Sequence, residues 1–516
     1  MPEELVNLTI DGVPVSVSKG MLVIEAAKQA GVLVPHYCYH PGLPVAGVCR
    51  MCLVEIEKQP KLAISCATQV AEGMVVKTQS AAAKRARTGV LEFLLINHPL
   101  DCPICDQAGE CELQDFTFQE GRAGTRYSPD YPKRFNPVED FGPDVLYVPN
   151  RCILCTRCVR FMEDVAREPV LNVSERGDRA YIGVHPETRL DHPWAGNVVD
   201  LCPVGSLLSK DFLHKARAWE LDKTASLCTG CSQGCNVTLD TRENVVVRVR
   251  PRPNLEVNRY FICDHGRMNY RWMNRGDRIE APLVKRGGEL HATDWQDALE
   301  RVTTTLRGAG PRVVSLVSPR ASTEALFFAR ELFRGLDWTG AFQVVMGEEA
   351  PLAGVPDLAL RAERAPNGRG AELLGYGREY AAALAAAQSA AVVLVLDEPD
   401  IPVRAGTLIY VGTVLPERAR DAEVVLPIAN VAEEDGSFVN RDGRVQRYAQ
   451  AKPAPGMARP AWWVFSELGA ALGHGEPVGS AAEAFERVAQ AIDALRGLSY
   501  EQLGFVGKPA AVPVAV

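Results

Sequence analysis

The chain has 516 residues, more than one hydrophobic core usually serves, so three or more domains are expected. Charged residues make up 23% and hydrophobic residues 47%, as in an ordinary soluble globular protein. The formal net charge of −8 argues against nucleic acid as a partner, because proteins that bind it owe much of their affinity to a basic surface.

The start of the chain, MPEELVNLTIDG, has no basic stretch followed by an apolar run, so it does not resemble a signal peptide. The most apolar window, residues 381–397, is interrupted by Gln388 and Ser389. It predicts an Ala-rich helix that leads into a buried strand, not a direct membrane span. We therefore expect a cytoplasmic protein, in which cysteines serve as metal ligands more often than as disulfides.

The first part of the chain predicts a small α+β unit. Strand-like runs lie at residues 5–10, 13–17, 52–56 and 74–78. Asp11 and Gly12 form a hairpin signal between the first two runs. A helical pattern at residues 21–30 follows and ends at Gly31.

A second helical pattern runs from Ser80 to about Asn97, and Pro99 should end it near His98. A proline-rich loop region follows over about residues 121–145. The back half contains the apolar runs VVSLVS, VVLVLD and LIYVG, and a helical segment follows the first. They lie at residues 313–318, 392–397 and 408–412. Continuous apolar runs of this length predict the buried parallel strands of a doubly wound α/β domain.

All fifteen cysteines lie in the front half of the chain and fall into four sets. The sets are Cys38, Cys49, Cys52 and Cys66; Cys102, Cys105 and Cys111; Cys152, Cys155, Cys158 and Cys202; and Cys228, Cys231, Cys235 and Cys263. The second set has only three cysteines, and His98 lies just before it. Fifteen cysteines and this histidine make four groups of four ligands with none left over, so His98 is predicted to complete the second set.

These spacings favour iron–sulfur clusters. The first set, C-x10-C-x2-C-x13-C, is related to the plant-type [2Fe–2S] pattern. The third, C-x2-C-x2-C with a distant cysteine before Pro203, is close to the bacterial ferredoxin pattern. We therefore expect one [2Fe–2S] cluster and three [4Fe–4S] clusters. Structural zinc is the alternative, because zinc sites use similar C-x2-C pieces, although the close triplet is less typical of zinc.

Other residues near the cysteines have more than one interpretation. His36 and His40 flank Cys38, but that set already has four cysteines, so we expect both histidines to be structural. Arginines around the third set could offset cluster charge or pair with nearby acids, and the sequence leaves both open. The arginines are Arg151, Arg157 and Arg160, and the acids are Glu163 and Asp164. No G-x-G-x-x-G motif follows a strand, so electrons are expected to enter from and leave to partner subunits.

The order of the four sets and several segments resemble the large iron–sulfur subunits (G subunits) of bacterial respiratory complex I, NADH:quinone oxidoreductase. The segments are KLAISC, LLINHPLDCPICDQAGECELQD, RCILCTRCVRF and DLCPVGSLL, and the resemblance covers about residues 1–277. It implies a multidomain α+β and α/β fold in which all sixteen candidate ligands match the family. The implied parts are a β-grasp [2Fe–2S] ferredoxin domain (1–79), a one-His/three-Cys [4Fe–4S] segment (80–120), a ferredoxin-like [4Fe–4S] segment (121–220), a molybdopterin-oxidoreductase-type [4Fe–4S] domain (221–277) and a shortened molybdopterin-oxidoreductase-like α/β domain (278–516).

The resemblance also implies a role. A flavoprotein NADH-oxidising subunit would supply electrons, which would pass through the first three sets toward the quinone-side subunits of complex I. The chain would have no catalytic residue of its own and would lie at the inner face of the cell membrane as part of a membrane-bound complex. The fourth set occurs in only some members of the family and lies off the main electron route.

The back half resembles the family more loosely. Residues 420–448 look like a molybdopterin-enzyme segment, but the region after residue 277 is short and holds no cysteine. We therefore expect a scaffold without molybdenum, in which Ser437 and Asn440 stabilise loops.

Two other functions fit parts of the pattern. An electron-transfer subunit of a formate dehydrogenase or NAD-reducing hydrogenase would share the same front half. A formate dehydrogenase needs a full molybdopterin domain, and an iron-only hydrogenase needs further cysteines downstream, which this sequence lacks. A zinc-stapled scaffold without a redox role is the alternative from a different class.

Overall fold

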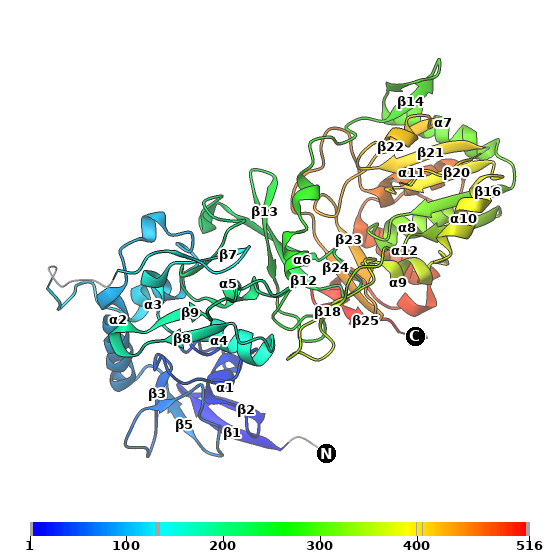
Figure 1. Cartoon of the computed structure of the whole chain (residues 1–516). Coiled ribbons are helices and arrows are strands. Elements are labelled where there is room, and N and C mark those ends of the chain that lie inside the picture. Colours follow the sequence, from blue (N-terminus) through cyan, green and yellow to red (C-terminus); the bar gives the residue numbers. More distant parts are fainter. Residues whose placement is uncertain (1–3, 129–134, 399, 405, 512–516) are drawn as a thin grey trace. The chain divides into compact units, whose positions relative to one another are not determined.

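The computed structural model describes residues 4–128, 135–398, 400–404 and 406–511. The chain forms two compact units, one of residues 1–220 with 352–356 and the other of residues 221–351 with 357–516 (Figure 1). Both units combine helices with sheets, so the predicted multidomain α+β and α/β class is confirmed. The division into five segments stays a prediction, and residues 129–134 of the predicted loop region lie outside the described part of the chain.

A five-stranded sheet begins the first unit, with the strand order β2-β1-β5-β3-β4. Its strands are β1 (Leu5–Ile10), β2 (Val13–Ser18), β3 (Leu53–Ile56), β4 (Ala63–Ile64) and β5 (Val75–Lys77). β1 and β2 are antiparallel and are joined by Asp11 and Gly12, whose φ angles of 47° and 84° suit a two-residue hairpin turn. Helix α1 (Val23–Gln29) packs its apolar residues into the same core as the sheet, so the predicted α+β unit is present.

Helices α2 (Ala81–Asn97) and α3 (Glu112–Glu120) contact each other in the same unit. The Ser80 side chain accepts a hydrogen bond of 3.2 Å from a backbone N–H of the first turn, which caps the start of α2. At the other end His98 already has extended backbone, as expected for the residue before Pro99. The predicted helix and its end are therefore confirmed.

Short elements surround the third cysteine set. The strands are β6 (Glu139–Asp140), β7 (Val145–Tyr147), β8 (Leu171–Ser174), β9 (Tyr181–Val184) and β10 (Leu207–Ser209), and the helices are α4 (Arg157–Arg160) and α5 (Asn197–Leu201). β7 pairs with both β6 and β10, and β8 pairs with β9. The pairing of β7 with β10 brings the segment before Cys152 beside the segment after Cys202.

The second unit contains a seven-stranded sheet with the order β15-β14-β22-β21-β20-β16-β17 (Figure 1). Its strands are β14 (Leu283–Arg286), β15 (Glu289–Ala292), β16 (Arg312–Val317), β17 (Asp337–Phe342), β20 (Val392–Leu396), β21 (Thr407–Gly412) and β22 (Val424–Pro427). The strands from β22 to β17 are parallel, and β14 and β15 are antiparallel at one edge. The predicted parallel strands are therefore confirmed.

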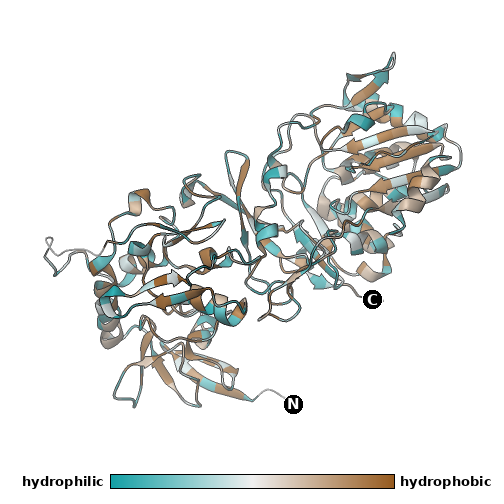
Figure 2. Cartoon of the chain, in the orientation of Figure 1, coloured by the Kyte–Doolittle hydropathy of each residue, from teal (hydrophilic) through white to brown (hydrophobic). Residues whose placement is uncertain are grey.

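Alternate residues of β20 enter two different cores. Val392, Leu394 and Leu396 pack with α7, α8, α11 and α12, whereas Val393 and Val395 pack with α10. These helices are α7 (Trp295–Arg307), α8 (Thr323–Glu331), α10 (Tyr380–Ala387), α11 (Ala461–Leu472) and α12 (Ala481–Ala491). Figure 2 shows the strands of this sheet mainly in apolar colours. A parallel sheet covered on both faces is the doubly wound arrangement that the sequence predicts.

Smaller elements complete the second unit. They are β11 (Asp222–Leu227), β12 (Asn236–Arg242), β13 (Val245–Pro251), β18 (Ala350–Pro351), β19 (Ala359–Leu360), β23 (Gly436–Val439), β24 (Arg444–Tyr448), β25 (Lys508–Pro509), α6 (Asp264–Met268), α9 (Gly368–Leu373) and α13 (Tyr500–Leu503). β11, β12 and β13 form one antiparallel sheet, and β23, β24 and β25 form another. Within the described residues, no helix has the length and apolar character that crossing a membrane requires.

Glu324 and Glu434 are carboxyl groups buried in the second unit. The Tyr500 hydroxyl donates a hydrogen bond of 2.7 Å to Glu324, and the Tyr448 hydroxyl donates one of 3.0 Å to Glu434. Burial raises the pKa of Glu324 to about 7 and the pKa of Glu434 to about 8. Both groups therefore keep their protons to a higher pH in the folded chain than in the unfolded chain.

We expect the substitution Leu394→Ala to lower the free energy of unfolding by about 2–5 kcal/mol, because it opens a cavity in a fully buried strand. The matched control is Leu255→Ala in the same unit, where the side chain is 61% exposed and the loss should be small. Urea unfolding followed by circular dichroism measures both. Equal losses in the two variants would contradict the assignment of β20 to the core.

The protonation of Glu434 predicts a pH-dependent stability. The unfolded chain releases this proton near the ordinary glutamate pKa of about 4.3, whereas the folded chain holds it to about 8. The contribution is therefore complete at acidic pH and is lost as the pH rises through about 8. Glu434→Gln, which cannot ionise, should be less sensitive to this pH change in urea unfolding. An unchanged pH dependence in the variant would refute the buried protonated carboxyl.

Candidate functional site

The first cysteine set lies beside the five-stranded sheet of the first unit. Cys52 comes directly before β3 and Cys66 follows β4, whereas Cys38 and Cys49 lie on the loop between α1 and β3. The thiol of Cys38 makes hydrogen bonds with those of Cys49 and Cys66, and the thiol of Cys66 also contacts that of Cys52. The fold therefore gathers all four sulfurs into one group.

Hydrogen bonds within this group favour ionised sulfur at two positions. Bonds from Cys49 and Cys66 lower the pKa of Cys38 below its ordinary value, and a bond from Cys66 lowers the pKa of Cys52 to about 7. A metal centre needs thiolates, so this proton sharing prepares the group for ligation.

The two histidines near Cys38 engage the backbone. The His36 ring contacts the Val34 carbonyl at 2.7 Å, and the His40 ring accepts a hydrogen bond of 3.1 Å from the N–H of Gly42. Burial lowers the pKa of His40 to about 3, so this imidazole is neutral at physiological pH. These contacts agree with the structural role expected for both residues.

The second set follows α2. Cys105 is buried, Cys111 is half-buried at the N-cap of α3, and Cys102 is exposed. The three thiols are close enough that ionised Cys102 or Cys105 would raise the pKa of Cys111, which burial already raises to about 11. His98 lies half-buried at the end of α2, and its place as the fourth ligand stays a prediction.

Gly205 makes room for the second set, although no sequence pattern singled this glycine out. A Cβ atom added at this position would lie 2.1 Å from the sulfur of Cys105. The backbone after Cys202 therefore lies directly against the sulfur of Cys105. In the sequence the one trace of this contact is the glycine in the segment DLCPVG.

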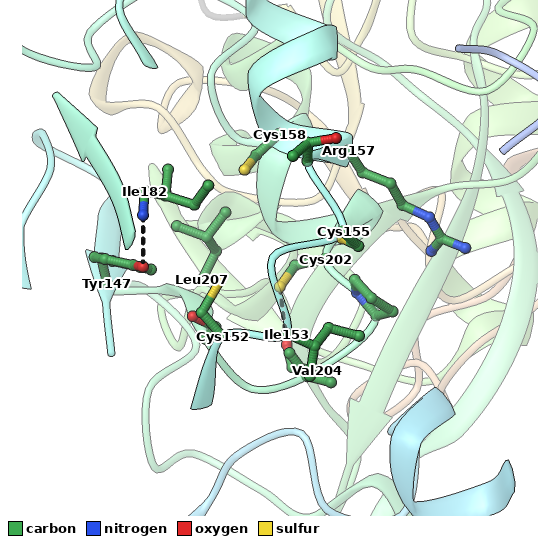
Figure 3. Close-up of a pocket in the computed structure, with 13 residues that line it drawn as sticks. Tyr147, Cys152, Ile153, Cys155, Arg157, Cys158, Ile182, Cys202, Val204 and Leu207 are labelled. Atoms are coloured by element: carbon green, nitrogen blue, oxygen red, sulfur yellow. Dashed lines mark hydrogen bonds between the residues drawn. The ribbon is translucent and has the colours of Figure 1, made fainter. Parts of the chain in front are cut away.

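The third set surrounds a single cavity in the first unit. Figure 3 shows the side chains of Cys152, Cys155, Cys158 and Cys202 around it, with Arg157 at its edge. The rest of the lining includes Tyr147, Ile153, Ile182, Val204 and Leu207. A mostly apolar cavity lined by four thiols has the donors and the dryness that a cubane cluster requires.

The loop of the third set is held in an uncommon backbone conformation. Leu154 and Thr156 have φ angles of 54° and 59°, although neither is glycine. The backbone N–H of Leu154 donates to the sulfur of Cys152 at 3.4 Å. Strained backbone of this kind concentrates at functional sites, where it directs side chains toward a common centre.

The fourth set is buried in the second unit. The N–H of Cys228 donates to the carbonyl of Cys235 at 2.9 Å, which closes the loop that carries three of the four cysteines. Cys263 comes from the segment before α6, and the N–H of Gly266 donates to its sulfur at 3.4 Å. A Cβ atom added at Gly266 would lie 2.8 Å from the sulfur of Cys228, so this glycine brings the two parts of the set together.

Amide side chains from β24 and the turn before it hold the loop of the fourth set. The Gln446 side chain donates to the carbonyl of Gly234 at 3.0 Å, and the Asn440 side chain donates to the carbonyl of Gln233 at 3.2 Å. Gly234 has a φ of 70°, and an added Cβ atom would lie 2.8 Å from Asn440. The expected loop-stabilising role of Asn440 is therefore present, and Gln446 shares it although the sequence did not point to it.

Ser437 has a different environment from the one around the cysteines. Its backbone N–H donates to the buried carboxyl of Glu324 at 3.0 Å, and its carbonyl accepts a bond of 2.9 Å from Thr323. Ser437 therefore ties β23 to the start of α8.

The arginines near the third set pair with acids from other segments. Arg151 pairs with Asp101 at 3.0 Å, and Arg157 pairs with Glu112 at 3.0 Å. Arg160 donates to the carbonyl of Cys38 at 2.5 Å. The ion pairs that the sequence suggested with Glu163 and Asp164 are therefore replaced by longer-range pairs in the described structure.

The donor sets fit iron–sulfur clusters. Within the part of the chain that the structure describes, no group of three or more His, Cys, Asp or Glu side chains is arranged to hold a single metal ion. The four sets offer soft thiol donors, mostly buried, with glycine backbone packed against several sulfurs. Such donors suit a larger sulfide-containing centre.

Family models match the chain in five places. They are described as 2Fe-2S iron-sulfur cluster binding domain (residues 3–81), NADH-ubiquinone oxidoreductase-G iron-sulfur binding region (87–126), NADH-quinone oxidoreductase subunit 3, ferredoxin-like domain (142–208), Molybdopterin oxidoreductase Fe4S4 domain (221–275) and Molybdopterin oxidoreductase (404–471). The predicted fold components are therefore confirmed, and the chain carries 2Fe–2S and 4Fe–4S binding domains.

Curated relatives match over about two thirds of the chain. The NADH-quinone oxidoreductase G subunit of Rickettsia conorii is 41% identical over 333 residues, which cover 64% of this chain and 49% of the relative. The NADH-ubiquinone oxidoreductase 78 kDa subunit of Neurospora crassa is 45% identical over 330 residues, 63% of this chain and 44% of the relative. The NADH dehydrogenase [ubiquinone] iron-sulfur protein 1 of Solanum tuberosum is 41% identical over 343 residues, 66% and 46%.

The chain spans about half the length of these relatives. Within the matched part, the order of the 2Fe–2S, NADH-ubiquinone oxidoreductase-G, ferredoxin-like and Fe4S4 domains agrees with the order of the four cysteine sets. The resemblance predicted from the sequence is confirmed, and this chain is a homologue of the large iron–sulfur subunit of NADH-quinone oxidoreductases.

Proposed function

We propose that this chain is an iron–sulfur electron-relay subunit of an NADH:quinone oxidoreductase. The observation that carries the proposal is the gathering of three cysteine-rich sets within the first unit, in the order of the matched domains. Several centres near one another suit the transfer of single electrons, whereas one structural centre needs no neighbours. The names of the curated relatives favour this function over a formate dehydrogenase or hydrogenase subunit.

Each set has a proposed occupant. Cys38, Cys49, Cys52 and Cys66 would hold one [2Fe–2S] cluster; His98, Cys102, Cys105 and Cys111, then Cys152, Cys155, Cys158 and Cys202, then Cys228, Cys231, Cys235 and Cys263 would each hold a [4Fe–4S] cluster. Bound iron–sulfur clusters supply reversible one-electron chemistry at potentials that the protein adjusts.

The residues of the chain would adjust those potentials in two ways. Burial excludes water from most of the sulfurs. Backbone N–H groups donate to the sulfurs of Cys49, Cys152, Cys228 and Cys263. Hydrogen bonds to ligand sulfur stabilise negative charge and so favour the reduced form.

The proposed partners are the flavoprotein NADH-oxidising subunit and the quinone-side subunits of complex I. No nucleotide-binding fingerprint is evident in the sequence, which supports the arrival of electrons from another subunit. We place the chain in a membrane-bound complex, peripheral to the inner face of the cell membrane.

The second unit would act as a scaffold without molybdenum. Its β23–β24 segment, which resembles a molybdopterin-enzyme segment, holds the loop of the fourth set through Asn440 and Gln446. This structural task explains why the segment is useful in a chain that needs no molybdenum chemistry.

Elemental analysis of the anaerobically purified chain tests this proposal. One [2Fe–2S] and three [4Fe–4S] clusters predict about 14 iron per chain, with matching sulfide and negligible molybdenum. About four zinc per chain without sulfide would refute the relay and leave a structural scaffold. Stoichiometric molybdenum would instead favour a formate dehydrogenase subunit.

The contact between Gly205 and Cys105 gives a site-specific prediction. Gly205→Ala would force the sulfur of Cys105 away from its position, because the new Cβ would lie 2.1 Å from it. We expect iron content to fall by about four per chain, with loss of one [4Fe–4S] signal in electron paramagnetic resonance.

The matched control is Gly124→Ala, where an added Cβ meets no atom within 4 Å. This variant should keep its full iron content. Full loading of both variants would show that Cys105 is not a ligand in the position described.

A further inference from the structure

Arg157 is a buried cation that joins three parts of the first unit. Its side chain is only 3% exposed. The guanidinium donates to the carbonyl of Tyr39 at 2.8 Å and to the carbonyl of Leu201 at 3.2 Å. It also donates to both carboxylate oxygens of Glu112, at 3.0 and 3.2 Å. One planar group therefore holds acceptors from the loop after α1, the start of α3 and the end of α5.

The acceptors of Arg157 all lie next to candidate ligands. Tyr39 follows Cys38, Glu112 follows Cys111 and Leu201 precedes Cys202. Arg157 itself lies between Cys155 and Cys158 and lines the cavity of the third set (Figure 3). A single side chain thus contacts the immediate neighbours of ligands from the first, second and third sets.

Arg160 strengthens part of the same connection. It donates to the carbonyl of Cys38 at 2.5 Å and to the carbonyl of Cys155 at 3.3 Å, and it also bonds the carbonyl of Pro44. These acceptors are neutral, so Arg160 ties the first set to the third without an acid to offset its charge in these contacts.

The charge of Arg157 is only partly neutralised. Its one carboxylate partner, Glu112, has a side chain that is 39% exposed, so water also solvates the negative charge. The positive charge lowers the pKa of Cys155 against the dominant effect of burial, which shows that it acts on the sulfurs of the third set. Because arginine stays protonated in proteins, this charge is permanent.

We propose that Arg157 is a positioning residue for the cysteine-bearing segments of the first unit, and that its charge raises the reduction potential of the centre held by the third set. Adding one electron to that centre adds one negative charge, which a nearby buried cation stabilises. This inference rests on the proposed electron-relay function.

The first test is a redox titration of the loaded full-length chain, with dye mediators and dithionite as the electron source, followed by electron paramagnetic resonance. Arg157→Gln removes the charge and should shift the midpoint potential of the third centre to a more negative value. Glu112→Gln removes the opposing charge and should shift it to a more positive value. Arg157→Lys keeps the charge and should stay close to the unaltered chain.

Arg87→Gln is the matched control. Arg87 is also fully buried in the first unit and pairs with Glu120 at 3.0 Å, but it contacts the Thr78 carbonyl and no neighbour of a candidate ligand in the described hydrogen bonds. It should leave the potential unchanged. Shifts of the same sign in Arg157→Gln and Glu112→Gln, or no shift in either, would overturn the role of the charge.

The second test needs no bound cluster. Hydrogen exchange in the cluster-free chain should become faster around Cys38, Cys111 and Cys202 together in Arg157→Gln, and only around α2 and α3 in Arg87→Gln. Faster exchange confined to α4 would overturn the positioning role. Failure of the unaltered chain to hold iron would refute the proposed function itself, and this outcome is distinct from normal loading without a shift in potential.

Discussion

The structure depends on gathering many thiols while limiting the repulsion that arises when they ionise. Burial keeps water away but raises the pKa of most of the thiols, for example to about 12 for Cys155 and Cys228. Ligation needs thiolates, so each set must supply compensating positive charge or hydrogen-bond donors. Backbone N–H groups meet part of this need at Cys152 and Cys263, and buried arginines meet another part in the first unit.

Close approach of backbone to sulfur is the second requirement of these sites. The glycines at 205 and 266 lie so near to cysteine sulfurs that a side chain could not be accommodated. The same geometry recurs at Gly234, where the loop of the fourth set turns with a positive φ against Asn440. Small residues therefore appear at points where two distant segments meet around a ligand, and not only at ordinary turns.

Much of the fold could be predicted because its causes are local. The Asp11–Gly12 turn, the Ser80 cap and the stop before Pro99 each act within a few residues. The parallel strands could be predicted because a sheet covered on both faces requires continuous apolar runs. The four cysteine sets were visible for a similar reason, since most of their ligands are close in sequence. The long-range contacts could not be predicted in this way: Arg157 pairs with Glu112, far away in the chain, and not with the nearby Glu163 or Asp164. Nothing in a local pattern indicates which distant acid a buried arginine meets, because such contacts follow from the packing of whole segments.

The surroundings of the third and fourth sets differ in charge. Arg157 and Arg160 place positive charge beside the third set, with Glu112 as the acid paired to the first of them. The polar groups around the fourth set are instead the neutral amide of Gln446 and the closed pair between Arg267 and Asp264. Because an added electron is stabilised by net positive charge, a reduced centre would be better compensated in the third set than in the fourth. The distribution of charged side chains therefore favours electron acceptance within the first unit.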